Sequence, residues 1–232
     1  MNSSGPAPAS IDTGVPHSAR VWNYWLGGKD HFAADREVGD RLAAAQPGIV
    51  AIARASRAFL VRAVRHLAGE AGIRQFLDIG TGLPTANNTH EVAQATTSEC
   101  RIVYVDNDPL VLVHARALLT STPEGATDYI EADIREPETI LQVASRTLNF
   151  DQPIALILQG ITHHIEDYDE VYAIVHRLLD GLTVGSYLVL GAPSCEGVDG
   201  DVQQAAFRLW NESGGRPPVV ARSRQEIAQF FD

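Results

Sequence analysis

The sequence is poor in three features that would point to particular classes of protein. It has only two cysteines, Cys100 and Cys195, in no metal-ligand spacing, so it offers neither a disulfide framework nor a zinc site. It lacks positive charge, and the formal net charge of −11 argues against general binding to nucleic-acid phosphates. No apolar run approaches the ~20 residues that cross a membrane. We therefore expect a cytoplasmic protein without a metal site and without a nucleic-acid or membrane partner.

What remains is an ordinary globular composition, with 45% hydrophobic and 20% charged residues in a chain of 232. Residues 1–16 are rich in Ser, Pro, Gly and Ala and contain no Lys or Arg, which predicts a flexible tail and not a signal peptide. Residues 17–72 show helical patterns, and residues 73–232 alternate between strand and helix patterns. We expect an N-terminal helical cap that forms one structural domain with an α/β core.

The cap carries an unusual aromatic cluster. Trp22, Tyr24 and Trp25 precede a Gly-Gly-Lys-Asp turn at residues 27–30. Helices are predicted from Ser18, over residues 33–45 and over residues 49–67. Two interpretations stay open. The segment is either a lid whose aromatic side chains cover a bound cofactor, or a plain helical cap whose aromatic side chains belong to the core.

Five short apolar runs follow, at residues 76–79, 101–105, 127–130, 153–158 and 186–190. Helical patterns separate them, beginning near residues 89, 109, 137 and 169, and two more helices begin near residues 202 and 223. The helix that begins with Asp108 as N-cap and Pro109 as its first residue is predicted to reach about Leu119. Strands that alternate with helices of this length imply right-handed crossovers. We expect a parallel sheet in the order 3-2-1-4-5 with helices on both faces.

The first of these strands belongs to the stretch QFLDIGTGLP at residues 75–84. Gly80 and Gly82 allow a tight turn and a close approach of the backbone to a ligand. A dinucleotide fingerprint would have a third glycine where this chain has Thr85, and it would seat a pyrophosphate, to which the Asp78 carboxylate is ill suited. S-adenosylmethionine has no phosphate and carries a sulfonium and an ammonium group. The turn therefore favours S-adenosylmethionine over NAD, unless Asp78 merely caps the turn.

Polar residues follow the next three strands as well. Asp106 lies some two dozen residues past Gly82, close to the offset of an acid that binds ribose hydroxyls. Asp133 would accept a hydrogen bond from the adenine amino group, and Gln159 would contact cofactor or substrate. The expected cofactor-binding residues are Tyr24, Asp78, Gly80, Thr81, Gly82, Asp106, Asn107, Asp133, Ile134 and Gln159.

His163 and His164 are the candidate catalytic residues, because they follow the fourth strand and histidine is the usual general base near neutral pH. Successive side chains point in different directions, so we expect at most one of them to reach the site. The alternative is a pair of structural loop histidines. Arg54, Arg57 and Lys29 are candidate partners for the cofactor's carboxylate, or simply solvated surface charges.

Six segments resemble the actinobacterial S-adenosyl methyltransferase family, long counted among the domains of unknown function, within the class I S-adenosylmethionine-dependent methyltransferases. They are ARVWNYWLGGKDHFAADRE, ARASRAFLVRAVRHLAGEAGIRQFLDIGTGLPT, NTHEVAQ, VYVDNDPLVLVHARALL, EADIREPE and GSYLVLGAPS. The resemblance implies a Rossmann-like sheet that binds S-adenosylmethionine through the turn at residues 78–82, Asp106 and Asp133, with S-adenosylhomocysteine as product. It does not indicate the methyl acceptor.

The sequence departs from this family in two places. Similar members tend to read Leu-His-His after the fourth strand, whereas this chain reads Gln-Gly-Ile-Thr-His-His at residues 159–164. The methyltransferase sheet normally ends in an antiparallel hairpin of strands six and seven, whereas this sequence stops at Asp232. We expect a missing hairpin and an exposed edge at strand five, which favours aggregation or a homo-oligomer.

Three functions stay open on the sequence alone. The first is a methyltransferase that acts on an unidentified small-molecule acceptor. The second is a non-catalytic protein that binds S-adenosylmethionine or S-adenosylhomocysteine as a sensor or partner. The third is an NAD-dependent oxidoreductase, against which Asp78 and Thr85 speak.

Overall fold

The computed structural model describes residues 11–118, 120–197 and 200–232. The first ten residues of the predicted tail and Leu119, the predicted end of one helix, lie outside the described residues. Within these ranges no helix has the length and apolar character needed to cross a membrane. Nor do the described His, Cys, Asp and Glu side chains form a group of three that could hold a metal ion.

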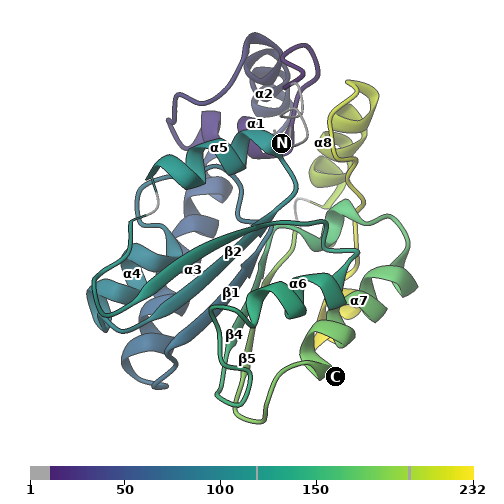
Figure 1. Cartoon of the computed structure of the whole chain (residues 1–232). Coiled ribbons are helices and arrows are strands. Elements are labelled where there is room, and N and C mark those ends of the chain that lie inside the picture. Colours follow the sequence, from purple (N-terminus) through teal and green to yellow (C-terminus); the bar gives the residue numbers. More distant parts are fainter. Residues whose placement is uncertain (1–10, 119, 198–199) are drawn as a thin grey trace, which may run out of the picture.

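Five parallel strands form the sheet in the order β3-β2-β1-β4-β5, which confirms the predicted topology (Figure 1). The strands are β1 (Gln75–Ile79), β2 (Arg101–Asp106), β3 (Ala126–Glu131), β4 (Ala155–Gln159) and β5 (Tyr187–Gly191). β4 begins two residues later than predicted, after Pro153, which has no N–H to give to a neighbouring strand. It extends one residue further than predicted and so contains Gln159.

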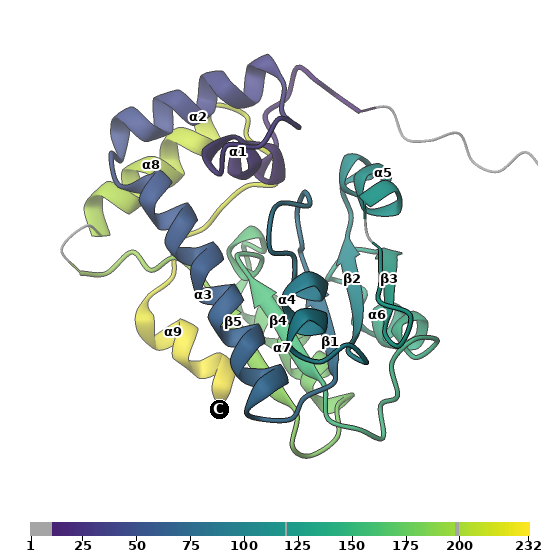
Figure 2. The same ribbon diagram turned by 90° about the vertical axis from the view of Figure 1, so that its left-hand side faces the viewer.

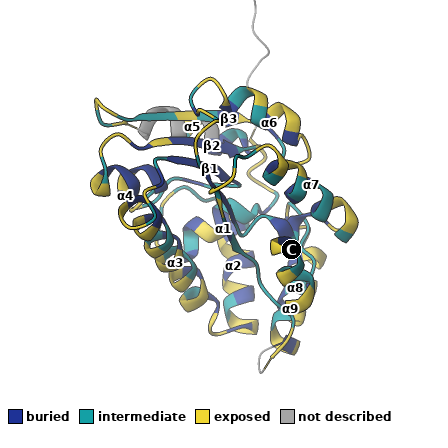
Figure 3. Ribbon diagram, turned by 90° about the horizontal axis from the view of Figure 1, so that it is seen from below, coloured by how far each residue is buried: buried dark blue, intermediate teal, exposed yellow. Residues whose placement is uncertain are grey.

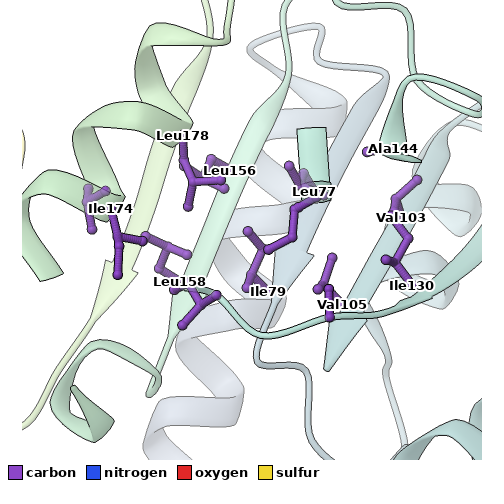
Figure 4. Packing of buried hydrophobic residues seen from close by; sticks show 14 of the residues in the cluster. Leu77, Ile79, Val103, Val105, Ile130, Ala144, Leu156, Leu158, Ile174 and Leu178 are labelled. Atoms are coloured by element: carbon purple, nitrogen blue, oxygen red, sulfur yellow. The ribbon is translucent and has the colours of Figure 1, made fainter. Parts of the chain in front are cut away.

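Helices cover both faces of the sheet. The face with α3 (Ile49–Gly69) and α4 (Thr89–Thr96) receives Phe76, whereas the face with α6 (Pro137–Ala144) and α7 (Tyr168–Asp180) receives Leu77 and Ile79. Side chains alternate along a strand, so the two faces take alternate residues of β1. Figure 4 shows the second of these layers, where buried aliphatic side chains from neighbouring strands and helices interlock. Burial of each such side chain stabilises the fold by ~1.5–3 kcal/mol.

The helical cap contains helices from both the N-terminal and the C-terminal part of the chain. Helices α1 (Ser18–Trp25) and α2 (Ala33–Ala45) pack with the start of α3 and with α8 (Gly200–Glu212), as Figure 2 shows. Trp25 and Trp210 are buried in this cluster, whereas Trp22 is 37% exposed. The division of the chain at residue 72 and the role of the cap as a lid remain predictions.

A buried ion pair fixes the start of the described chain to the cap. Arg20 Nε lies 3.2 Å from Asp35 Oδ1, and both side chains are buried. The same carboxylate accepts hydrogen bonds from the backbone N–H groups of His17 at 2.9 Å and Phe32 at 2.7 Å. Because the buried charges are paired and hydrogen-bonded, the segment before α1 is held in place. It runs beside the start of α5 (Pro109–Leu118), where Asp108 is the helix cap that the sequence predicted.

The last elements are the short helix η1 (Thr162–His164), α9 (Arg224–Ala228) and η2 (Gln229–Phe231). The sequence did not predict η1, but it did predict the capping box in which Ser223 Oγ accepts from the N–H of Glu226. Among the described residues β5 pairs with β4 alone, and Tyr187 is 44% exposed. Figure 3 shows exposed residues on the outer surfaces of the helices and buried ones along the strands. The missing hairpin and the homo-oligomer remain predictions.

Candidate functional site

The glycine turn after β1 forms the floor of the site. Gly80 and Gly82 have φ angles of 75° and 65°, in the left-handed region that favours glycine. The Gly80 N–H donates to the carbonyl of Val105 at 2.8 Å, which fixes the turn to the end of β2. A Cβ on Gly80 would lie 2.8 Å from the side chain of Ile161 after β4. The turn and the β4 loop therefore meet where no side chain fits between them.

Asp106 links this turn to α5. Its Oδ2 accepts a hydrogen bond from the Gly82 N–H at 2.8 Å, and its Oδ1 accepts one from the Asp108 N–H at 3.0 Å. Burial raises the pKa of Asp106, while the two N–H groups act in the opposite direction. The residue predicted to bind ribose is thus held rigidly beside the glycine turn.

Asn107 and Asp133 meet at the neighbouring strand ends. Asn107 Nδ2 donates to Asp133 Oδ2 at 3.0 Å, and Asp133 Oδ1 accepts from the Arg135 N–H at 2.9 Å. These residues line one pocket, whose further walls are Ile79, Gly80, Val105, Asp106, Ala132, Ile134, Ile161, His164, Ile165 and Pro217. A larger hollow at residues 145–151 lies in the loop that leads into β4, at the opposite ends of the strands, and contains none of the predicted site residues. The smaller pocket thus contains half of the predicted site residues, namely Gly80, Asp106, Asn107, Asp133, Ile134 and His164.

Asp78 lies deeper, on the sheet face that α3 and α4 cover. Its side chain is 5% exposed, and its Oδ2 accepts a hydrogen bond from the Thr89 hydroxyl at 2.6 Å. Burial raises the pKa of Asp78 to about 6, against the opposing effects of Thr89 and Arg57. One carboxylate oxygen therefore bonds the first residue of α4. The other accepts no hydrogen bond from the described residues.

Three predicted residues have partners of their own in the structure. The Tyr24 hydroxyl donates to Asp40 Oδ1 on α2 at 2.7 Å, away from the glycine turn. Gln159 Nε2 donates to Ser56 Oγ on α3 at 2.7 Å, in space that the missing Cβ of Gly191 leaves open. Thr81 lies in the turn, where its hydroxyl is 3.4 Å from the Gly82 carbonyl. Their contacts with a cofactor remain predictions.

Helix η1 places the two histidine rings side by side, with their centroids 4.2 Å apart. His164 lines the pocket with Asp106, its Nδ1 is 3.0 Å from the Pro218 carbonyl, and burial lowers its pKa to about 4. The His163 ring stacks on Phe207 of α8, with centroids 6.1 Å apart and planes at 11°. Burial also lowers the pKa of His163 well below its usual value. That at most one histidine reaches the acceptor stays a prediction.

Sequence reasoning missed several residues that shape the site. His17 Nδ1 lies 3.1 Å from Asp108 Oδ2, and the buried Arg222 donates Nη1 to the Thr162 carbonyl at 2.8 Å, which holds η1. Thr89 and Ser56 bond to Asp78 and Gln159. Apart from the Asp78–Thr89 bond, these contacts join residues far apart in the chain, so no local sequence pattern predicts them.

A parallel sheet in this order, with a glycine turn after β1 and acids at or near the ends of three neighbouring strands, is typical of the Rossmann-like class of folds, which bind ligands at this edge. Residues 4–232 match the family described as S-adenosyl methyltransferase, and the chain belongs to this family. It is an S-adenosylmethionine-dependent methyltransferase, which confirms the predicted family and cofactor. The carboxylates at the site suit a cofactor that carries positive charge and no phosphate.

Two solved structures from actinobacteria are similar to the chain throughout. A DUF574 family protein from Streptomyces avermitilis MA-4680 is 44% identical, with a TM-score of 0.91, over 96% of this chain and 85% of that one. A provisionally named methyltransferase from Thermobifida fusca YX is 43% identical, with a TM-score of 0.87, over 99% of this chain and 84% of that one. No curated protein matches the chain.

Proposed function

We propose that the chain methylates a small-molecule acceptor at the carboxyl edge of its sheet, with the nucleoside of the cofactor bound by Asp106 and Asp133. The observation that carries this proposal is the anchoring of Asp106 by the N–H groups of Gly82 and Asp108, at 2.8 and 3.0 Å. A carboxylate has about four lone-pair sites, so both of its oxygens can still accept from ribose hydroxyls.

The adenine contact rests on Asp133 and its neighbours. Asn107 and the Arg135 N–H each bond one oxygen of Asp133, which orients the carboxylate at the rim of the pocket. The buried Ile134 offers an apolar wall for a flat ring. Asp133 would accept from the exocyclic amino group of adenine, while Asp106 accepts from the ribose.

The same carboxylates disfavour the oxidoreductase alternative. Asp78, Asp106 and Asp108 all lie around the glycine turn and the start of α5. A pyrophosphate at this turn would be repelled by them, whereas a sulfonium and an ammonium would be attracted.

His163 is the residue we assign as general base for the acceptor. When bound, S-adenosylmethionine supplies a methyl group on a positively charged sulfur, and the protein supplies orientation and exclusion of water. The Nδ1 of His163 is buried and has no hydrogen-bond partner among the described residues, and the lowered pKa keeps its ring neutral near pH 7. His164 is a structural residue in this proposal, since its Nδ1 is engaged by the Pro218 carbonyl.

The test combines binding with transfer. Isothermal calorimetry of the full chain should show binding of S-adenosylhomocysteine and no comparable binding of NAD. Methyl-labelled S-adenosylmethionine, incubated with the protein and a cell extract, should label small molecules. The Asp106→Ala variant serves as the inactive control. Tighter binding of NAD, or label found only in protein or nucleic acid, would contradict the proposal.

A further inference from the structure

The proposed position of the nucleoside dictates where the other end of the cofactor lies. With adenine at Asp133 and ribose at Asp106, an elongated ligand must continue from β2 across the turn after β1 toward β4. Helix α3 passes this region (Figure 2). There Ser56 bonds to Gln159 at the end of β4, and the next residue, Arg57, bonds to the segment that follows the glycine turn.

Arg57 keeps much of its hydrogen-bonding capacity free. All three of its hydrogen bonds use Nη2, which donates to the carbonyls of Asn87 at 2.8 Å and Ala86 at 3.3 Å and to Asn88 Oδ1 at 3.2 Å. Its Nε is buried and has no partner among the described residues. A guanidinium presents its donors in a planar fork that matches a carboxylate. Nε and Nη1 are thus available on the edge of the fork that the loop does not use.

The charge of Arg57 is also unbalanced. Asp78 attracts it through space, but the salt bridges of the described residues do not include an ion pair between the two, and Thr89 bonds one oxygen of the Asp78 carboxylate. A partly buried cation and a buried carboxylate therefore lie near one another, each with unused capacity. An α-amino acid carries the complementary pair of charges, a carboxylate and an ammonium.

We infer that Arg57 binds the carboxylate of the cofactor's amino-acid end, beside Asp78, which faces its ammonium group. This assignment rests on the proposed function and extends it from the nucleoside, assigned to Asp106 and Asp133, to the amino-acid end of the cofactor. The other two candidate cations are poorly placed for the role. Arg54 is exposed on the same helix, and Lys29 is exposed in the Gly-Gly-Lys-Asp turn.

The experiment compares three ligands by calorimetry on the full chain. S-adenosylhomocysteine has the whole amino-acid end, its decarboxylated analogue lacks only the carboxylate, and methylthioadenosine lacks the amino-acid end. We expect the wild type to bind the decarboxylated analogue at least tenfold more weakly than S-adenosylhomocysteine. Equal affinity for these two ligands would overturn the assignment without any mutation.

The variant Arg57→Gln should bind S-adenosylhomocysteine ten- to hundredfold more weakly and methylthioadenosine within twofold of the wild type. Arg57→Lys, which keeps the charge but not the fork, should bind S-adenosylhomocysteine with an affinity between those of the wild type and Arg57→Gln. The control Arg54→Gln should bind it as tightly as the wild type. A parallel loss of both ligands would show that Arg57 only supports the loop at residues 86–88, and would overturn the assignment. A wild type that binds none of the three ligands would instead contradict the proposed function.

Discussion

The ends of β1, β2 and β3 differ in chemistry from the end of β4, although all four border the same site. The first three present carboxylates, and Asp106 and Asp133 each accept a hydrogen bond from the backbone N–H two residues further on. The end of β4 presents neutral groups, Gln159 and His163, whose side chains meet partners on α3 and α8.

This contrast agrees with the two roles proposed for these regions, cofactor binding at the ends of β1, β2 and β3 and proton removal at the end of β4. A bound cation and two hydroxyl groups call for acceptors with negative charge, which the first region supplies. Removing a proton from an acceptor calls for a neutral base, and burial at the end of β4 keeps its histidines neutral. The two regions should therefore respond differently to mutation and to pH.

The largest effect is expected from Asp106→Ala in the first region. In the proposed site two ribose hydroxyls donate to the Asp106 carboxylate, and each of these hydrogen bonds is worth ~1.5–3 kcal/mol, so their loss should lower the affinity for S-adenosylhomocysteine about a hundredfold or more. The control is Glu131→Ala, since Glu131 is exposed and pairs with Asp106 in the register of β2 and β3. Calorimetry measures both variants. An unchanged dissociation constant in folded Asp106→Ala would remove this residue from the site.

A gain of stability is expected from Asp78→Asn. An acid whose pKa is raised to about 6 by burial makes the folded state less stable above that pH than below its unfolded pKa. An amide can still accept from Thr89, so at about pH 8 the variant should gain roughly 1–3 kcal/mol of unfolding free energy. This gain should shrink as the pH is lowered toward 4.

Urea unfolding at both pH values measures this effect, with Asp180→Asn at the exposed end of α7 as control. A variant less stable than the wild type at about pH 8 would show that Arg57 and Thr89 compensate the buried charge. In that case the buried acids at the ends of β1, β2 and β3 would stabilise the fold as well as bind the cofactor, and the contrast with the end of β4 would need revision.

The smallest effect is expected from His164→Asn in the second region. The folded state holds the pKa of His164 at about 4, so the wild type loses stability as the pH falls below the unfolded value of 6.5. An asparagine can donate to the Pro218 carbonyl without taking up a proton. When the pH is lowered from neutral to about 5, the unfolding free energy of the wild type should fall by roughly 1–2 kcal/mol more than that of the variant.

Thermal or urea unfolding between about pH 7 and pH 5 measures this slope. His66→Asn is the matched control, since His66 is 58% exposed beside Glu70 on α3. Parallel pH profiles for wild type and His164→Asn would mean that η1 opens to let the ring ionise.

The same contrast explains how far the sequence could predict the site. The strands, the glycine turn and the bond from the Asp108 N–H to Asp106 depend on local signals, namely apolar runs, glycines and acids at strand ends. The surroundings of Gln159 and His163 depend on Ser56 and Phe207, which lie elsewhere in the chain. Helix η1 escaped prediction because it is three residues long and held by the distant Arg222.

Tyr24 also has partners that the sequence did not indicate. Its contact with the cofactor stays a prediction, while its hydroxyl bonds to Asp40 and its ring lies against Gly39, where a Cβ would come within 2.9 Å of it. Gly28 likewise makes room for Asn23, whose side chain accepts from the Asp30 N–H. In this motif the small residues accommodate side chains of the cap itself.

The close packing of Gly80 against Ile161 has a consequence for how the protein folds during its synthesis on the ribosome. β1, β2 and β3 leave the ribosome first, and the floor of the site closes only after the β4 loop has emerged and joined them. Contacts between residues so far apart in the chain form late, because the entropy of closing the intervening loop must be overcome first. A nascent chain that lacks the β4 loop therefore has no complete cofactor site, and the cofactor does not act as a template for its folding. S-adenosylmethionine acts on the finished fold, whose population it raises by mass action.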